Sequence, residues 1–293
     1  MQLIDGKQLS TTIKEEIKTS VDLIRQHGGK VPHLAAVLVG DDGASQAYVN
    51  GKVRSCEKVG FRSTLIQESS DLSQEKLLAI IDKLNDDDDI DGFIVQLPLP
   101  PQIDVDRIIQ AINPTKDVDG FHPLNVGRMV AGLPCYLPAT PYGIITMLER
   151  YKIETKGKEC VILGRSNIVG TPLSILLSRN NDPGNCTVTL CHSKTKELKE
   201  KAAQADILIA ALGMPQFVTA DMVKEGAVVI DVGISRVPDD SAKRGYRLKG
   251  DVNFESVAAK CSYITPVPGG VGPMTITSLL LNTLQAASKE IYP

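Results

Sequence analysis

Residues 160–170, CVILGRSNIVG, place an apolar run directly before a glycine-containing turn and the start of a helix. Such a run is typical of a strand buried on both faces of a parallel sheet. Gly164 permits a tight turn, and the free amides of the following helix N-terminus can receive a pyrophosphate. Ser166 and Val169 stand where the usual pattern has its second and third glycines. The segment predicts a Rossmann-type nucleotide-binding turn, with a plain strand-to-helix connection as the alternative.

The segments on both sides of this turn alternate between strand and helix patterns, which predicts parallel sheets. Further strands are expected at 33–40 (HLAAVLVG), 61–67, 92–99, 187–191, 206–212 and 227–233. Helices are expected at 45–59, 73–84, 140–151, 168–179 and 197–205. We therefore predict an α/β protein with two three-layer α/β domains, the second a Rossmann-type doubly wound NADP domain, joined by two long helices.

The length of 293 residues suits two domains of ordinary size. The first domain is predicted to comprise residues 1–140 plus 273–293, and the Rossmann domain residues 141–272. The final helix, from Pro273 to about Ile291, is expected to return to the first domain.

Composition limits the kinds of partner. A formal net charge of −3 gives no electrostatic reason to expect nucleic acid or an anionic membrane surface. No apolar run approaches the roughly 20 residues of a membrane helix, and the N-terminal residues lack a signal pattern. With no Trp and 4% aromatic residues, the stacking surfaces of single-strand binders are missing. We expect a soluble, cytoplasmic protein that binds small molecules.

The six cysteines form no Cys-x-x-Cys pair, and only four histidines could join them as metal ligands. In a chain of this size such cysteines are typically reduced and buried. We therefore expect no metal site. The acidic run at residues 86–89 is predicted to be a solvated loop.

The second strand of the predicted Rossmann unit indicates the cofactor. In NAD-binding proteins this strand usually ends in an acidic residue that holds the ribose hydroxyls. Here it ends in His192, Ser193 and Lys194, without a carboxylate. Together with Arg165, these side chains suit a 2′-phosphate, which predicts NADP. Ordinary surface polarity is the alternative for His192 and Lys194.

Tyr48 and Lys52 lie four residues apart on a predicted helix and so share one face, which differs from the face of Val49 and Val53. They could therefore line a cleft while the valines pack. A solvated and a half-buried side chain without function is the alternative. The same spacing is a catalytic pair in other NADP-linked enzymes, but inside the Rossmann domain, and here the pair precedes that domain.

Gln96, in VQLPLP, is a polar residue at the end of a buried strand. Ligand crevices form at such strand ends in open α/β sheets. An internal hydrogen bond is the alternative for Gln96. In KDVDG, Asp117 and Asp119 would share a face if extended, and one carboxylate matches the paired N–H donors of an amino-pyrimidine. The Gly- and Pro-rich loop at 265–275 leads into a helix and allows close backbone approach to a flat ligand.

Six motifs occur in order: YVNGK at 48–52, VQLPLP at 95–100, KDVDGFHPLNVGR at 116–128, GRSNIVG at 164–170, CHSKT at 191–195 and ITPVPGGVGPMT at 264–275. Together they strongly resemble the methylenetetrahydrofolate dehydrogenase/cyclohydrolase family over essentially the whole chain. The resemblance implies a folate-binding first domain and a homodimer built through the Rossmann domains. It also implies NADP-dependent oxidation of 5,10-methylenetetrahydrofolate to the methenyl form, followed by hydrolysis to 10-formyltetrahydrofolate.

The resemblance also implies roles for individual residues. Lys52 is the key catalytic residue, Tyr48 packs on the folate, Gln96 bonds to Lys52, and Asp119 anchors the pterin. The implied folate contacts are Tyr48, Lys52, Val95, Gln96, Leu97, Asp119, Pro268, Gly269, Gly270 and Thr275. The implied NADP contacts are Gly164, Arg165, Ser166, Ser193 and Ile234.

Residues 180–185 (NNDPGN) depart from the common pattern and lengthen the approach to the second Rossmann strand. A dehydrogenase without cyclohydrolase activity is the nearest alternative, and the intact Tyr48, Lys52, Gln96 and Asp119 favour both activities. A silent nucleotide sensor would not need Lys52 and Asp119. A shikimate or amino-acid dehydrogenase would lack the PGGVGP loop.

Overall fold

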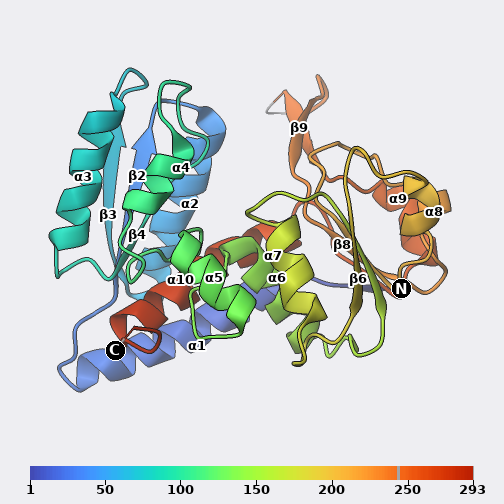
Figure 1. The fold of residues 1–293 in the computed structure, drawn as a ribbon, viewed down its shortest axis with the longest axis horizontal. Coiled ribbons are helices and arrows are strands. Elements are labelled where there is room, and N and C mark those ends of the chain that lie inside the picture. Colours follow the sequence, from blue (N-terminus) through green and yellow to red (C-terminus); the bar gives the residue numbers. More distant parts are fainter. Residues whose placement is uncertain (243–244, 293) are drawn as a thin grey trace. The chain divides into compact units, whose positions relative to one another are not determined.

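The chain folds into two compact units. The computed structural model describes residues 1–242 and 245–292, with Ala44 described by its backbone only. The three-strand unit comprises Thr11–Ala139 and the described residues from Ile276 onward, and the six-strand unit comprises Met1–Ser10 and Thr140–Thr275. Figure 1 draws their helices and strands and labels many of them.

The six-strand unit is built on a parallel sheet in the order β1-β11-β8-β7-β5-β6. The chain adds β6 on one side of β5 and then places β7 on the other side. This reversal is the switch point at which doubly wound sheets bind ligands. The strands are β1 Gln2–Leu3, β5 Glu159–Leu163, β6 Thr187–Cys191, β7 Ile207–Ala210, β8 Val228–Asp231 and β11 Tyr263–Ile264.

Helices cover both faces of this sheet because alternate strand residues point to opposite sides. Val161 and Leu163 pack in one buried cluster with residues of α8 (Leu198–Ala202) and α9 (Phe254–Val257). Helix α7 (Gly170–Ser178) contacts β5 and β6, and its buried leucines are not part of that cluster, so it covers the opposite face. The unit also contains α6 (Ala139–Arg150), two 3-10 turns (Ala220–Met222 and Ala258–Lys260) and an antiparallel hairpin of β9 (Ser235–Pro238) and β10 (Tyr246–Lys249).

The three-strand unit has a parallel sheet in the order β3-β2-β4, formed by Arg62–Glu68, His33–Val39 and Gly92–Val95. All seven residues of β2 are buried, as its apolar sequence predicts. Helices α3 (Gln74–Asp86) and α4 (Val105–Ala111) pack on the face that carries Ala35, Val37 and Phe93. Helix α2 (Gly43–Val59) contacts β2 and β3 from the other face, and α5 (Pro123–Ala131) follows α4.

The predicted fold class is confirmed: two α/β units, the second with a doubly wound parallel sheet. The division before Thr140 lies within one residue of the predicted boundary, and the division before Ile276 lies three residues beyond the predicted one. Residues 1–10 differ from the prediction, because β1 pairs with β11 and belongs to the six-strand sheet. Helix α1 (Gly6–Gln26) therefore also carries the chain between the units, in addition to α10 (Val271–Ala287) and the start of α6.

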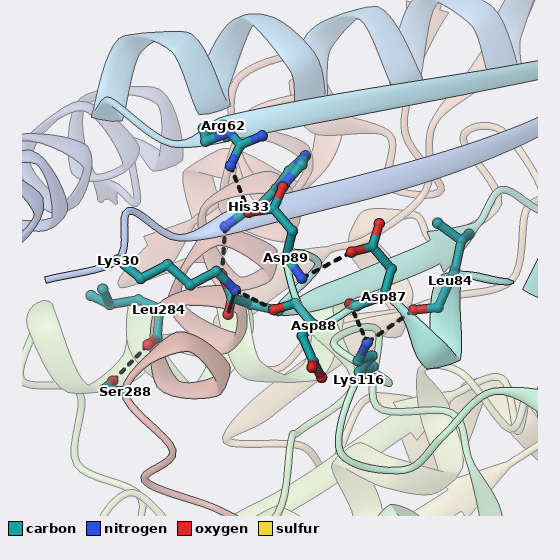
Figure 2. Close-up of polar contacts among 11 residues, drawn as sticks. Lys30, His33, Arg62, Leu84, Asp87, Asp88, Asp89, Lys116, Leu284 and Ser288 are labelled. Carbon is teal, nitrogen blue, oxygen red and sulfur yellow. Dashed lines mark hydrogen bonds and ion pairs between the residues drawn. The ribbon is translucent and has the colours of Figure 1, made fainter.

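The acidic run at residues 86–89 is more than a solvated loop. Asp89 pairs with Arg62 at 2.6 Å and with His33 Nδ1 at 3.0 Å, as Figure 2 shows. The carbonyls of Asp87 and Asp88 accept hydrogen bonds from Lys116 and Lys30, at 2.7 and 2.8 Å. These contacts tie the run to the amino-terminal ends of β2 and β3. Asp86, Asp87 and Asp88 are exposed, as expected of a solvated run, but the contacts could not be predicted, because apolar periodicity says nothing about which cations lie nearby.

The six cysteines are all buried and unpaired, as predicted. Over residues 1–242 and 245–292, no helix has both the length and the apolar character needed to cross a membrane.

Candidate active site

Helix α2 brings Tyr48 and Lys52 together. Asp42 begins the helix by accepting a hydrogen bond from the Ser45 amide at 2.8 Å, and Gly60 ends it in a left-handed conformation. Lys52 is only 6% exposed, and its Nζ lies 5.8 Å from the centre of the Tyr48 ring. The predicted shared face is therefore observed, and a lysine at this burial requires polar partners.

Gln96 supplies one of these partners from the residue directly after β4. Its Oε1 accepts a hydrogen bond from Lys52 Nζ at 3.1 Å, while its Nε2 donates to the Leu97 carbonyl at 2.6 Å. The second bond fixes the amide so that its oxygen points to the lysine. The hydrogen bond between Lys52 and Gln96 that the resemblance implies is present in the structure.

Asp119 lies in a turn after the isolated bridge between Phe93 and Asp117, within electrostatic reach of Lys52. Burial lowers the pKa of Lys52 and raises the pKa of Asp119, because each ion loses its water shell. The attraction between the two charges opposes both shifts. The site therefore holds an acid and a base whose proton affinities are drawn together, which is typical of a catalytic centre.

The predicted folate contacts divide between the two units. Val95 and Leu97 line a narrow pocket together with Asp119 and Phe121 in the three-strand unit. The other four predicted contacts, Pro268, Gly269, Gly270 and Thr275, lie in the six-strand unit. The backbone of that loop is held closely, since the Lys7 amide donates to the Gly269 carbonyl at 2.8 Å. Its helix begins at Val271, two residues before the predicted Pro273.

The turn from β5 into α7 has the geometry of a phosphate-binding turn. A Cβ on Gly164 would lie 2.1 Å from the Ala211 carbonyl oxygen, and one on Gly170 would lie 1.9 Å from the Gly164 oxygen. No side-chain hydrogen bond caps α7. Arg165 and Ser166 are exposed, and Ser166 Oγ accepts from the Val169 amide at 3.2 Å. Close-packed glycines at the start of a helix fit the pyrophosphate of a dinucleotide, so the residues present suit this group.

The other predicted cofactor residues also lie beyond the carboxyl ends of strands. Ser193 is exposed in the turn after β6, and Ile234 is 51% exposed after β8. His192 Nδ1 accepts a hydrogen bond from the Lys194 amide at 3.1 Å, so this ring nitrogen is engaged within the turn after β6. Carboxyl ends of parallel strands meet at one edge, so these residues and the β5–α7 turn share that edge of the sheet.

Two buried carboxylates at this edge were missed by the sequence analysis. Asp231 ends β8 and accepts from the amides of Gly233, Asp251 and Val252 at 2.9–3.0 Å. Asp251 accepts from Leu212 and Gly213, at 2.6 and 3.0 Å, beyond the end of β7. Burial raises the pKa of Asp231 to about 6. The pair fixes the loops beyond β7 and β8; an acid at the end of the apolar run 227–233 was the available signal.

Comparison with known proteins finds family models that match both the segment with Lys52 and Asp119 and the segment with the β5–α7 turn. Residues 4–119 match the catalytic-domain model of the tetrahydrofolate dehydrogenase/cyclohydrolase family, and residues 138–291 match its NAD(P)-binding-domain model. A protein of Cytophaga hutchinsonii named "Bifunctional protein FolD" is 64% identical over 98% of this chain and 99% of its own length.

Solved structures agree as well. The bifunctional FolD enzyme of Campylobacter jejuni is 47% identical, covers 99% of both chains and superposes with a TM-score of 0.92. The dehydrogenase-cyclohydrolase of Trypanosoma brucei, solved with NADP and an inhibitor, is 36% identical with a TM-score of 0.93, over 99% of this chain and 98% of that one. The predicted resemblance is confirmed, and with it the bifunctional interpretation over a dehydrogenase alone. The chain belongs to the tetrahydrofolate dehydrogenase/cyclohydrolase family.

Proposed function

We propose that the Lys52–Gln96–Asp119 cluster is the centre at which this chain carries out both reactions of its family. The enzyme oxidises 5,10-methylenetetrahydrofolate with NADP and hydrolyses the methenyl product to 10-formyltetrahydrofolate. The observation that carries the assignment is the buried Lys52, with its Nζ 3.1 Å from Gln96 Oε1 and its pKa lowered by burial. An apolar residue could fill this position without the cost of burying a charge. A buried lysine beside an acid therefore indicates a chemical role.

The lowered pKa of Lys52 suits both steps. Oxidation of the methylene bridge leaves a delocalised cation on the substrate, and a lysine whose pKa is lowered repels it less than one that stays fully protonated. In the second step, a neutral Nζ can accept a proton from the water that attacks the methenyl carbon. Gln96 holds Nζ in place by accepting one of its protons, so that the nitrogen lone pair points elsewhere. The lysine is thus the general base of water addition.

Asp119 is proposed to bind the pterin. Two carboxylate oxygens match the paired N–H donors of an amino-pyrimidine edge, which favours a bidentate contact. Tyr48, one helical turn before Lys52, provides an aromatic face for a flat ring system. Val95, Leu97, Pro268, Gly269, Gly270 and Thr275 are proposed as further folate contacts.

NADP, when bound, supplies the acceptor for the hydride. Gly164 and Ser166 at the β5–α7 turn are proposed to border its pyrophosphate, and Arg165 with Ser193 to bind its 2′-phosphate. Ile234 is proposed to give an apolar contact. The six-strand unit would then be the NADP-binding domain and the three-strand unit the folate-binding catalytic domain. We also propose a cytoplasmic homodimer that binds neither nucleic acid nor membranes.

The function is tested by following absorbance after the protein is mixed with methylenetetrahydrofolate and NADP, and then with NAD. We expect NADPH to form without accumulation of methenyltetrahydrofolate. Persistent methenyltetrahydrofolate would leave only a dehydrogenase, and a preference for NAD would overturn the proposed roles of Arg165 and Ser193.

A further inference from the structure

The turn that carries Asp119 is held by a network of buried polar side chains that has no direct part in the chemistry. Asp117 is 1% exposed, and its carboxylate accepts from the amides of Phe121 and His122, at 3.2 and 2.8 Å. These bonds close the backbone of residues 117–122 around Asp119. The conformation of the Asp119 backbone therefore depends on where the Asp117 carboxylate lies.

Asn125 in turn fixes Asp117. It is fully buried in α5, and its Nδ2 donates to Asp117 Oδ2 at 2.9 Å and to the Pro114 carbonyl at 3.0 Å. Its own Oδ1 accepts from the Tyr292 hydroxyl at 2.8 Å. The Asp117 carboxylate and the Pro114 carbonyl accept hydrogen bonds, so they require Nδ2 to face them, and the Tyr292 hydroxyl then donates to Oδ1 and holds the amide in that position. Removing the hydroxyl would leave that orientation without one of its supports.

Tyr292 is itself well placed, although it follows α10 and lies far from Asp119 in the sequence. Its ring lies 5.8 Å from the Tyr136 ring and 4.9 Å from the Arg128 guanidinium carbon. Tyr136 donates to the Thr115 carbonyl at 3.1 Å, two residues before Asp117. The ring therefore packs independently of the hydroxyl, and a phenylalanine would retain both ring contacts.

A second support comes from α10. Asn282 is fully buried, and its Nδ2 donates to the carbonyls of Val118 and Leu137, both at 2.8 Å. Gly120 has a φ of +73°, and a Cβ there would lie 2.6 Å from the Leu137 carbonyl carbon. The backbone at Val118 and Gly120, on the two sides of Asp119, is thus held against Leu137. These contacts restrict the turn to one conformation.

We propose that Tyr292, through Asn125 and Asp117, is a positioning residue for Asp119 and so determines how tightly the enzyme binds the folate. This rests on the proposed role of Asp119 as the pterin anchor. The same chain of hydrogen bonds makes Asn125 and Asp117 positioning residues, with Asn282 acting from the other side. None of the four is proposed to touch the substrate.

The test is a double-mutant cycle on the full chain with Tyr292→Phe and Asp119→Asn. Tyr292→Phe should raise KM for methylenetetrahydrofolate about three- to tenfold, the range expected for one lost hydrogen bond, and leave KM for NADP unchanged. In the Asp119→Asn background, Tyr292→Phe should raise the folate KM no further, because residues that act as one unit are not additive.

Tyr151→Phe is the matched control. The Tyr151 hydroxyl accepts from the Asp5 amide at 2.7 Å, so this change also removes a tyrosine hydrogen bond between distant residues, but in the six-strand unit. Both phenylalanine variants should lower the melting temperature by a few degrees. Only Tyr292→Phe should change the folate KM; an equal change in both variants would mean a general loss of stability and would overturn the proposal.

The remaining outcomes separate the two ideas. If Asp119→Asn raises the folate KM and Tyr292→Phe does not, the positioning role is wrong and the anchor stands. If Tyr292→Phe raises the folate KM equally with and without Asp119, it does not act through that residue, and the inference fails. If Asp119→Asn has no effect on KM, the anchor role itself is wrong, and the inference falls with it.

Discussion

The proposed sites in the two units are built from different kinds of polar group. In the three-strand unit, the proposed site consists of ionisable side chains withdrawn from water, with Lys52 6% exposed and the pKa of both Lys52 and Asp119 displaced by burial. In the six-strand unit, the proposed site consists of backbone amides and close-packed glycines, with Arg165, Ser166 and Ser193 exposed. The difference follows from the task. Proton transfer needs altered proton affinities, whereas a pyrophosphate needs only fixed N–H donors.

The comparison predicts its largest effect at Lys52. Lys52→Ala should lower the rate of methenyltetrahydrofolate hydrolysis about 10²- to 10⁴-fold, the usual contribution of a general base. Dehydrogenation should fall much less, because hydride transfer needs no base at this position. The two rates are measured separately, with methenyltetrahydrofolate alone and with methylenetetrahydrofolate plus NADP. Water addition at the wild-type rate would remove Lys52 from the mechanism.

Gly164→Ala should have the next largest effect, and it should change only the binding of NADP. The new Cβ would lie 2.1 Å from the Ala211 oxygen, in a residue with φ of +115°, so the backbone of the turn must move. We expect the Kd for NADP, measured by calorimetry, to rise more than about tenfold, while hydrolysis of methenyltetrahydrofolate without NADP persists.

Gly157→Ala is the control for this prediction. Gly157 also has a positive φ, +72°, but nothing lies within 4 Å of the position of its Cβ. It should cost about 1 kcal/mol of stability and leave the Kd for NADP unchanged. If both alanine variants weakened NADP binding equally, backbone strain and not the β5–α7 turn would be responsible.

A third prediction concerns pH, and compares a buried acid of each unit. Burial raises the pKa of Asp117 to about 7 and that of Asp231 to about 6. An acid whose pKa is raised by folding holds its proton more tightly in the folded state. Its stabilising contribution is complete below the unfolded pKa of about 4 and is lost as pH rises through the folded pKa.

The free energy of unfolding should therefore fall by about 4 kcal/mol between pH 5 and pH 8, and most of the fall should come from Asp117. Urea denaturation at four pH values checks this, and Asp117→Asn should flatten the dependence. Carboxylates with lowered pKa, such as Asp206 and Asp221, act only near pH 4 and below, outside this window. Stability that rose from pH 5 to pH 8 would contradict the assignment.

The same contrast explains how much the sequence could predict. Apolar runs and periodicity identified β2 and β5, because a strand buried on both faces has few other solutions. The spacing of Tyr48 and Lys52 fixes their shared helix face by geometry alone. Contacts within one helix or at one strand end are local, and sequence carries local information well.

Several contacts between distant segments were missed, although the resemblance implied the one between Lys52 and Gln96. The two-residue strand β1 is too short to show a pattern, and only its pairing with β11 places residues 1–10 in the six-strand unit. Nothing in the sequence around Tyr292 indicates that its hydroxyl meets Asn125, which is distant in the chain. Asp231 was also missed, because its partners are backbone amides, which every residue has.

The smallest predicted effect is on the choice between NADP and NAD. Arg165 is exposed, so its attraction to a 2′-phosphate is screened by water and salt, and Arg165→Ala should reduce the preference for NADP only about tenfold. The ratio of kcat/KM for the two cofactors measures it, and kcat with NADP should change little. Arg107→Ala changes an exposed arginine of the three-strand unit and should leave the ratio unchanged.

High salt should reduce the preference for NADP over NAD in the wild type but not in Arg165→Ala, because salt screens only a contact between charges. A salt-independent preference would instead mean that the β6 turn selects NADP by shape.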